Sequence, residues 1–253
     1  MATANDTPEA QSTSPQASSV ELFDHQWATY RAVLDADLMG HRAITTATAD
    51  ALTSHLAQRP AAAAAPQMVD LGCGDLALLA PVLRQLPLGS YRGLDLTAAV
   101  LPLAQEALGN VGYLCDWQQA DLLSWAVESP ANGAIDILHS CFAIHHLDGD
   151  QKQTFLRHTR TKMAAGSLFL WADVFREPGE SRDHYVNRYA ERIRRHWPLN
   201  PERQEQIISH LSQFDHPEDR EAIVAAAEAN GWHWHWLWQG PHQAEALAML
   251  TPA

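Results

Sequence analysis

Residues 68–80, MVDLGCGDLALLA, constrain the fold more than any other stretch, because an apolar run leads directly into two glycines and then into a second apolar run. A short apolar run cut off by glycines is typical of a buried strand. A glycine-rich turn between a strand and a helix usually receives an anionic group, since free backbone N–H groups and the helix dipole favour negative charge there. The stretch therefore predicts one strand–turn–helix unit of an α/β sheet, with a ligand at the turn.

The same alternation continues along the chain. Strand-like runs occur at 90–96, 113–123, 134–147 and 167–175, and helical patterns occur at 76–86, 97–110, 148–166 and 216–231. The last two strand-like runs, 232–238 and 243–250, are joined by only four residues and should pair antiparallel. We therefore expect a Rossmann-like, doubly wound α/β sheet of seven mostly parallel strands that ends in an antiparallel C-terminal hairpin.

Three segments lie outside this alternation. Residues 1–19 are rich in Ser, Thr, Ala and Pro and are expected to form a disordered tail. Residues 20–60 carry apolar residues at helical spacing and predict N-terminal helices, and residues 177–213 predict a helical insert that acts as a lid. We expect one domain over residues 20–253.

Composition excludes several classes of function. The formal net charge of −13 would repel phosphate backbones, so nucleic acid is not an expected partner. No stretch approaches the roughly 20 apolar residues of a membrane-spanning helix, so no membrane is expected either. The 3 cysteines fit neither a disulfide framework nor a Cys-x-x-Cys metal site, and the N-terminus lacks an apolar signal core. We expect a cytoplasmic protein.

The glycine turn satisfies the G-x-G-x-x-G/A pattern of dinucleotide folds through Gly72, Gly74 and Ala77, and Asp95 ends the next expected strand. A nicotinamide enzyme is therefore one hypothesis. Asp70, however, would repel a pyrophosphate and attract a cation. A ligand with an adenosine at one end and an ammonium at the other would satisfy both aspartates. The alternative is that Asp70 caps a helix or braces the loop.

The chain resembles the class I S-adenosylmethionine-dependent methyltransferases in this turn and in the motifs that follow it. VDLGCGD is similar to the first motif of that family, GLDL to the second, ADLL to the third and DILHSCFAIHHL to the segment along the fourth strand, over roughly Val69 to Leu250. The resemblance implies S-adenosylmethionine as cofactor and S-adenosylhomocysteine as product. It places the following residues around the donor: Asp70, Gly72, Cys73, Gly74, Asp95, Leu96, Asp121, Leu122, Ser140, Cys141 and Phe142. Many relatives read GCGTG, whereas Asp75 and Leu76 occupy the last two positions here.

Two histidines are candidates for catalysis. His145 and His146 end the fourth expected strand, at the edge where ligands of open α/β sheets bind. An imidazole has a pKa suited to deprotonating an oxygen or nitrogen nucleophile. The alternative is that both residues only shape the end of the strand.

Candidates for acceptor binding come from the segments outside the alternation. The insert carries Tyr185, Arg188, Tyr189 and Arg192, which could bind an anionic or aromatic acceptor, and the N-terminal helices carry Trp27, Tyr30 and His41, which could close over it. The alternative for the insert is a solvated amphipathic helix whose tyrosines pack on the core.

A metal site is not expected. His233 and His235 alternate along a strand, with His242 nearby, but no carboxylate or cysteine stands at a familiar ligand spacing. An exposed polar face between buried tryptophans explains the pattern better.

The sequence therefore predicts an enzyme that transfers a methyl group from S-adenosylmethionine to a small-molecule acceptor by in-line displacement. Two other classes stay open, a nicotinamide-dependent oxidoreductase and a non-catalytic domain that binds the donor and regulates a partner. The acceptor atom and the oligomeric state do not follow from the sequence.

Overall fold

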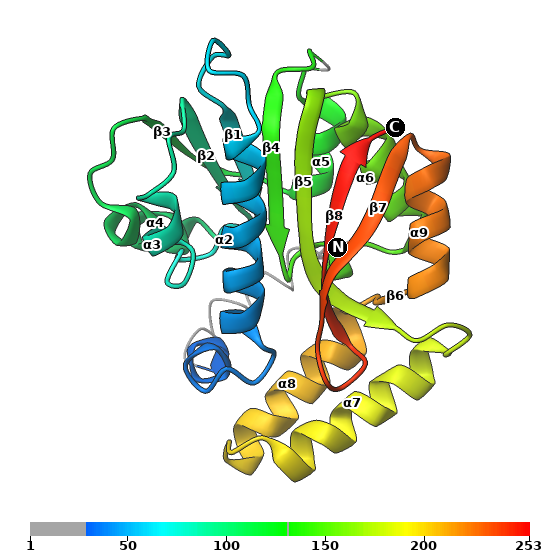
Figure 1. Cartoon of the computed structure of the whole chain (residues 1–253). Helices are drawn as coiled ribbons and strands as arrows, with labels where there is room; N and C mark the ends of the chain where they lie inside the picture. Colours follow the sequence, from blue (N-terminus) through cyan, green and yellow to red (C-terminus); the bar gives the residue numbers. More distant parts are fainter. Residues whose placement is uncertain (1–28, 131) are drawn as a thin grey trace, which may run out of the picture.

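The computed structural model of the chain describes residues 29–130 and 132–253 (Figure 1). The expected tail at 1–19 and the predicted acceptor residue Trp27 lie outside the described residues.

A single sheet organises the fold, with the strand order β3-β2-β1-β4-β5-β8-β7. Its strands are β1 (Gln67–Leu71), β2 (Ser90–Asp95), β3 (Leu114–Gln119), β4 (Ile135–Cys141), β5 (Met163–Arg176), β7 (Trp232–Gln239) and β8 (Glu245–Pro252). Strands β1 to β5 pair in parallel, β8 runs antiparallel to β5 and β7, and the short β6 (Glu218–Asp219) pairs with the end of β5. The expected doubly wound sheet with its C-terminal hairpin is confirmed.

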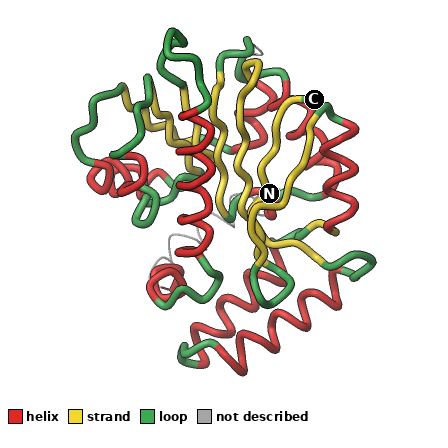
Figure 2. Tube along the Cα trace, viewed as in Figure 1, coloured by secondary structure: helices red, strands yellow, loops and turns green. Residues whose placement is uncertain are grey.

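Helices cover both faces of the sheet (Figures 1 and 2). On one face lie α2 (His41–Ala57), α3 (Ala80–Leu83) and α4 (Leu101–Leu108), which follows the 3₁₀ turn η1 (Ala98–Val100). On the other face lie α5 (Leu122–Glu128), α6 (Gly149–Arg160) and α9 (Arg220–Ala229). Apolar side chains of the strands therefore form two cores, one on each side, as a largely parallel sheet requires.

The start of α6 shows how local sequence sets an element boundary. Asp148 accepts a hydrogen bond from the Gln151 backbone N–H, and the Gln151 side chain accepts one from the Asp148 N–H. This capping box satisfies two N–H groups that a helix start leaves without partners, and it was expected from the sequence. It also ends the turn that carries the 3₁₀ segment η2 (Ile144–His146).

The expected bounds of one helix and of one strand are wrong. The helix expected over 76–86 is reduced to the four residues of α3, because Leu76 has a left-handed φ of 56° and Pro81 lies in the first turn. The third strand ends at Gln119, before the expected 123, because Asp121 caps α5 by accepting a hydrogen bond from the Ser124 N–H.

The insert forms two helices, α7 (Arg182–His196) and α8 (Pro201–Phe214), which lie together beyond the carboxyl ends of β4 and β5 (Figure 1). They share a third core, separate from those of the sheet, in which Tyr185, Ile193, Trp197 and Leu211 are buried. Val174 of β5 and Val33 belong to the same core, so the insert packs both on itself and on the carboxyl end of the sheet.

One buried ion pair fixes α7 to the sheet. Glu245 at the start of β8 is 1% exposed and accepts hydrogen bonds from the Tyr189 hydroxyl at 2.6 Å and from Arg192 Nη1 at 2.5 Å. Arg192 also donates to the Leu38 carbonyl. The pair thus joins the insert, the C-terminal hairpin and the N-terminal segment.

We predict that Arg192→Ala lowers the free energy of unfolding by about 3–5 kcal/mol, because it leaves the Glu245 carboxylate buried without its cation. Chemical denaturation monitored by circular dichroism measures the change.

The matched control is Arg194→Ala on the same helix, whose ion pair with Glu205 is exposed, with side chains 52% and 60% accessible. Its loss should change the free energy of unfolding far less than the loss of the buried pair, because water and salt screen an exposed ion pair. Equal effects of the two variants would contradict the structural role of the buried pair.

Candidate active site

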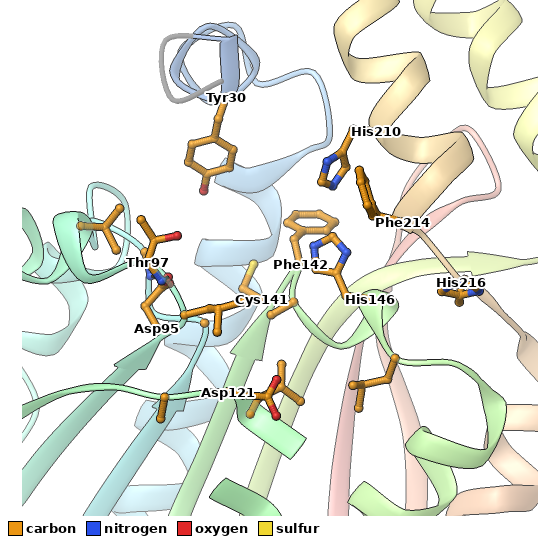
Figure 3. A pocket seen from close by; sticks show the side chains of 18 of the residues that line it. Tyr30, Asp95, Thr97, Asp121, Cys141, Phe142, His146, His210, Phe214 and His216 are labelled. Carbon is orange, nitrogen blue, oxygen red and sulfur yellow. Dashed lines mark hydrogen bonds between the residues drawn. The ribbon is translucent and has the colours of Figure 1, made fainter. Parts of the chain in front are cut away.

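A cavity of about 480 Å³ opens at the carboxyl ends of β1, β2 and β4 (Figure 3). This is the point where the strand order reverses on either side of β1, the usual ligand position in open α/β sheets. Eight of the predicted donor residues line it: Gly72, Gly74, Asp95, Leu96, Asp121, Leu122, Cys141 and Phe142. The structure thus brings most of the predicted donor residues to one cavity.

The glycine turn forms the floor of this cavity. Gly72 has a φ of 69°, and a Cβ atom there would lie 2.5 Å from Ala143 Cβ, so no other residue fits without displacement of the chain. Gly74 donates its backbone N–H to Asp95 Oδ2 at 2.9 Å. Leu76 occupies the last position of the turn, where many relatives have glycine. It nevertheless adopts a left-handed backbone conformation.

Asp95 holds the adjoining loop. Its second oxygen, Oδ1, accepts the Thr97 N–H at 2.9 Å. Burial raises the pKa of Asp95, against the lowering effect of these backbone donors. Asp95 therefore links the glycine turn to the end of β2 and faces the cavity as an acceptor (Figure 3).

Three predicted donor residues do not line the large cavity. Asp70 is 1% exposed, accepts a hydrogen bond from the Tyr91 hydroxyl at 2.8 Å, and lies 2.7 Å from His139 Nδ1. The Ser140 hydroxyl donates to the Leu71 carbonyl, and Cys73 is buried behind the turn. The geometry favours the bracing role for Asp70 rather than direct attraction of an ammonium group, because its carboxylate is already bound within the sheet.

A second, apolar cavity of about 140 Å³ lies between the sheet and the insert. Its walls include Val33, Met39, Val174 and Ile207, and Tyr30, Phe142, His146 and His210 line both this cavity and the larger one. The two cavities therefore share a wall. Phe142 has a φ of 53°, an unfavourable conformation for an aromatic residue that turns the chain at this wall.

The predicted acceptor tyrosines and His41 all line the apolar cavity. Tyr30 points into the large cavity (Figure 3), and Tyr185 and Tyr189 line the apolar one. His41 also lines the apolar cavity, in edge contact with the Phe142 ring, and burial lowers its pKa to about 4. His41 is therefore neutral at ordinary pH.

The two predicted acceptor arginines are bound elsewhere. Arg188 donates to both carboxylate oxygens of Glu180 and to the carbonyls of His242 and Gln243, and Arg192 is bound to Glu245. Neither lines either cavity. The sequence shows the charge of these arginines but not the carboxylates that neutralise it, so the two residues give no support to an anionic acceptor, which stays a prediction.

His145 is held by a buried carboxylate that the sequence analysis did not single out. Asp173 Oδ1 lies 2.5 Å from His145 Nδ1, and Oδ2 accepts the His145 backbone N–H at 3.0 Å. Burial lowers the pKa of His145, but the Asp173 and Asp215 carboxylates outweigh it and the pKa is raised overall. The ring is thereby oriented with Nε2 on the side away from Asp173.

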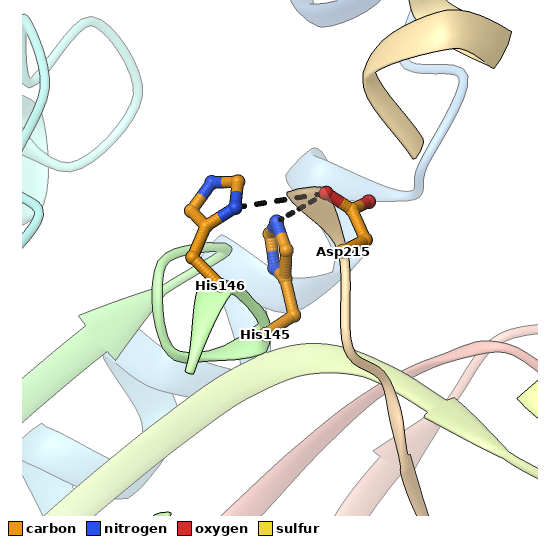
Figure 4. Close-up of side chains that lie close together, drawn as sticks. All are labelled: His145, His146 and Asp215. Atoms are coloured by element: carbon orange, nitrogen blue, oxygen red, sulfur yellow. Dashed lines mark ion pairs between the residues drawn. The ribbon is translucent and has the colours of Figure 1, made fainter. Parts of the chain in front are cut away.

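His146 belongs to a second group of side chains (Figure 4). His145 Nε2 and His146 Nδ1 each lie 3.6 Å from Asp215 Oδ1, and His210 Nε2 lies 3.5 Å from the same oxygen. Burial, and then the neighbouring His145 and His210 rings, hold the pKa of His146 well below its ordinary value. Burial raises the pKa of Asp215 to about 6 and lowers that of His210 to about 4.

Sequence reasoning missed Asp173, His210 and Asp215. Asp173 had a detectable signal, since it is a lone acid at the end of the apolar run 167–175. His210 and Asp215 had none, because they reach the site only through the packing of α8. His233 and His235 lie on the exposed face of β7, as the alternation predicted.

Comparisons with known proteins identify the domain. Residues 69–169 match the family model of a methyltransferase domain. No curated protein sequence matches the chain.

Solved structures share the fold. Magnesium protoporphyrin IX methyltransferase from Synechocystis PCC 6803, solved with bound S-adenosylhomocysteine, has a TM-score of 0.65 at 12% identity over 94% of this chain and 100% of that chain. The DhpI complex with S-adenosylhomocysteine has a TM-score of 0.60 at 14% identity over 95% and 99%. Geranyl diphosphate C-methyltransferase from Streptomyces coelicolor A3(2) has a TM-score of 0.53 at 15% identity over 82% and 77%.

The family match, the topology and the cavity at the carboxyl edge agree with one another and decide against a nicotinamide-dependent oxidoreductase. Residues 69–169 are a methyltransferase domain, and the fold is that of S-adenosylmethionine-dependent methyltransferases of known structure.

Proposed function

We propose that the chain methylates a small molecule bound in the apolar cavity, and that His145 accepts the proton of the acceptor. The observation that carries this proposal is the buried pair of His145 and Asp173, which lies at the carboxyl ends of β4 and β5 and lines the apolar cavity through His145. The large cavity would hold the donor.

The residues of the large cavity fit S-adenosylmethionine. Asp95 and Asp121 are carboxylates at the ends of β2 and β3, where they can accept hydrogen bonds from ribose hydroxyls and an adenine amine. The Gly72 turn allows close approach of a ligand because a side chain there would meet Ala143. When bound, the donor supplies a methyl group already activated on a positively charged sulfur.

The apolar cavity indicates the class of acceptor. Most of its wall is aliphatic and aromatic, its polar side is formed mainly by histidines and Asp215, and no lysine or arginine lines it among residues 29–130 and 132–253. An acceptor with an apolar or aromatic body and one hydroxyl or amine would bury its body against Val174, Tyr185 and Trp197. The similar structures include a magnesium protoporphyrin IX methyltransferase and a geranyl diphosphate methyltransferase, so this fold accepts small molecules of very different shape.

His145 is the best candidate for the base. Its Nδ1 faces Asp173, so Nε2 is the nitrogen left to take a proton, and Asp173 stabilises the resulting imidazolium. His146 is a poorer base because its pKa is lowered well below the ordinary value. The chain would then align the acceptor, exclude water and remove the proton as the methyl group is transferred.

The proposal extends to the surroundings of the site. We assign α7 and α8, which form the insert expected over residues 177–213 and end at Phe214, the role of a lid over the acceptor, with residues 20–253 as one functional domain. None of the helices that the structure describes is both long and apolar enough to cross a membrane. A cytoplasmic location and the absence of a nucleic-acid partner are also part of the proposal, since they rest on cysteine content and net charge.

We predict that Asp95→Ala weakens binding of S-adenosylhomocysteine by about 1–3 kcal/mol, because it removes a charged acceptor from the donor cavity. Isothermal titration calorimetry measures the affinity. Asp116→Ala is the control, since that exposed aspartate on β3 pairs with Arg92, does not line the cavity and should leave affinity unchanged. Wild-type affinity in the Asp95 variant would refute the placement of the donor.

We predict that His145→Gln and Asp173→Asn each lower kcat by about 10²–10⁴-fold while sparing the affinity for S-adenosylhomocysteine, because they act on proton removal. An acceptor is first found by screening a library for S-adenosylhomocysteine release. His233→Gln, on the exposed face of β7, should retain full activity. Undiminished kcat in the His145 variant would show that this residue is not the base.

The pH dependence provides a separate test. A base acts in its neutral form, so kcat should rise with pH through the pKa of His145, above the ordinary 6.5 of histidine. In Asp173→Asn the rising limb should move to lower pH, because burial remains while the nearest carboxylate charge is lost. A rising limb at the same pH in both proteins would assign it to another group.

A further inference from the structure

The side chains of His145, His146 and Asp215 converge on one small volume beside the apolar cavity (Figure 4). One ligand atom from each lies within 4.8 Å of the other two. We propose that these three residues bind a divalent transition-metal ion, and that Zn²⁺ is the ion whose preferences they match. This extends beyond the sequence analysis, which expected no metal site.

The distances within the group fit shared coordination better than direct hydrogen bonding. His145 Nε2 and His146 Nδ1 each lie 3.6 Å from Asp215 Oδ1, which is longer than an N–H···O hydrogen bond. Around a tetrahedral Zn²⁺ with bonds of about 2.0–2.1 Å, two ligand atoms are separated by about 3.3 Å. These two distances therefore need to shorten by only a few tenths of an ångström, and the two histidine nitrogens, which lie within 4.8 Å of each other, must also approach one another to hold one ion.

Two polar atoms of the group are buried without hydrogen bonds. Asp215 Oδ1 and His146 Nδ1 are both inaccessible to solvent and make no hydrogen bond. A buried carboxylate oxygen without a donor is costly, and a buried imidazole nitrogen without a partner adds to the cost. A divalent cation between them would satisfy both atoms with one contact each.

The surroundings resemble the supporting shell of a metal site. Metal-binding histidines commonly donate their other ring nitrogen to a carboxylate, which fixes the ring and strengthens the ligand. Asp173 holds His145 Nδ1 in this way and leaves Nε2 directed at Asp215. His210 Nε2, from α8, lies 3.5 Å from the same Asp215 oxygen and is a candidate fourth ligand.

The donor set selects the class of ion. Two imidazole nitrogens and one carboxylate suit Zn²⁺ and its first-row neighbours, whereas Mg²⁺ and Ca²⁺ prefer shells of oxygen atoms. Three protein ligands next to a cavity also leave a position for an oxygen of a bound small molecule.

One consequence rests on the proposed function. Metal binding and proton acceptance would use the same atom, His145 Nε2, so the metal-free and metal-loaded proteins would activate an acceptor in different ways. The binding site itself does not depend on that function, and its test uses neither donor nor acceptor.

The test is titration of the full-length protein with Zn²⁺ by calorimetry in the presence of a weak competing chelator, together with the visible absorption spectrum of the Co²⁺-loaded protein. We expect one site and the intense absorption of four-coordinate Co²⁺. Asp215→Asn and His146→Gln should each weaken Zn²⁺ binding at least about tenfold, and Asp173→Asn should weaken it about 10- to 100-fold through the orientation of His145.

The matched control is the double variant His233→Asn/His235→Asn, which removes two exposed histidines from β7 and should bind Zn²⁺ as wild type does. Circular dichroism of each variant checks that it is folded. Two ligand variants are used, so that the test still decides if one of them does not fold. Unchanged binding in Asp215→Asn and His146→Gln, loss of binding in the β7 control, or a six-coordinate Co²⁺ spectrum would overturn the proposal. Failure here leaves methyl transfer intact, because that activity is measured separately.

Discussion

The arrangement of the residues around the apolar cavity depends on one buried carboxylate, Asp173, at the end of strand β5. It accepts hydrogen bonds from the Trp171 indole at 3.0 Å, from the Val174 backbone N–H at 2.9 Å and from the His145 backbone N–H at 3.0 Å, and it contacts the His145 ring. An ionised group that is 1% exposed is tolerable only when it is surrounded by donors in this way. The same bonds pull the segment after β4 against β5, and they thereby set the wall that both cavities share.

Most of the fold could be predicted from the sequence, because its signals are local. The glycine turn, the alternation of apolar runs and the capping box at Asp148 each act through residues a few positions apart. The failure over 76–86 is also physical. Apolar spacing there indicates a helix, but the left-handed residue Leu76 and the proline at 81 restrict it to α3. Burial rather than helical periodicity explains the apolar residues before it.

The residues around the methyl donor could be predicted from the sequence, but those around the acceptor could not. Donor residues follow strand ends and a short motif, so their position in the sequence nearly determines their position in space. Acceptor residues depend on how the insert packs, which no local pattern encodes. Arg192 illustrates the problem: its charge is visible in the sequence, but its partner Glu245 is brought to it by the sheet and the hairpin. Asp215 was missed for the same reason, since only the return of the chain after α8 brings it to His145 and His146.

The third core, formed within α7 and α8 and the segments beside them, has an evolutionary consequence. Residues such as Ile193 and Leu211 are buried among their own neighbours rather than in either core of the sheet. The insert also reaches the donor cavity, because His210, Gln213 and Phe214 of α8 line it. Substitutions at positions such as Ile193 and Leu211 would therefore reshape the acceptor side while both cores of the sheet keep their packing. A gene duplicate could change its acceptor in this way as long as selection preserves the α8 residues at the donor cavity.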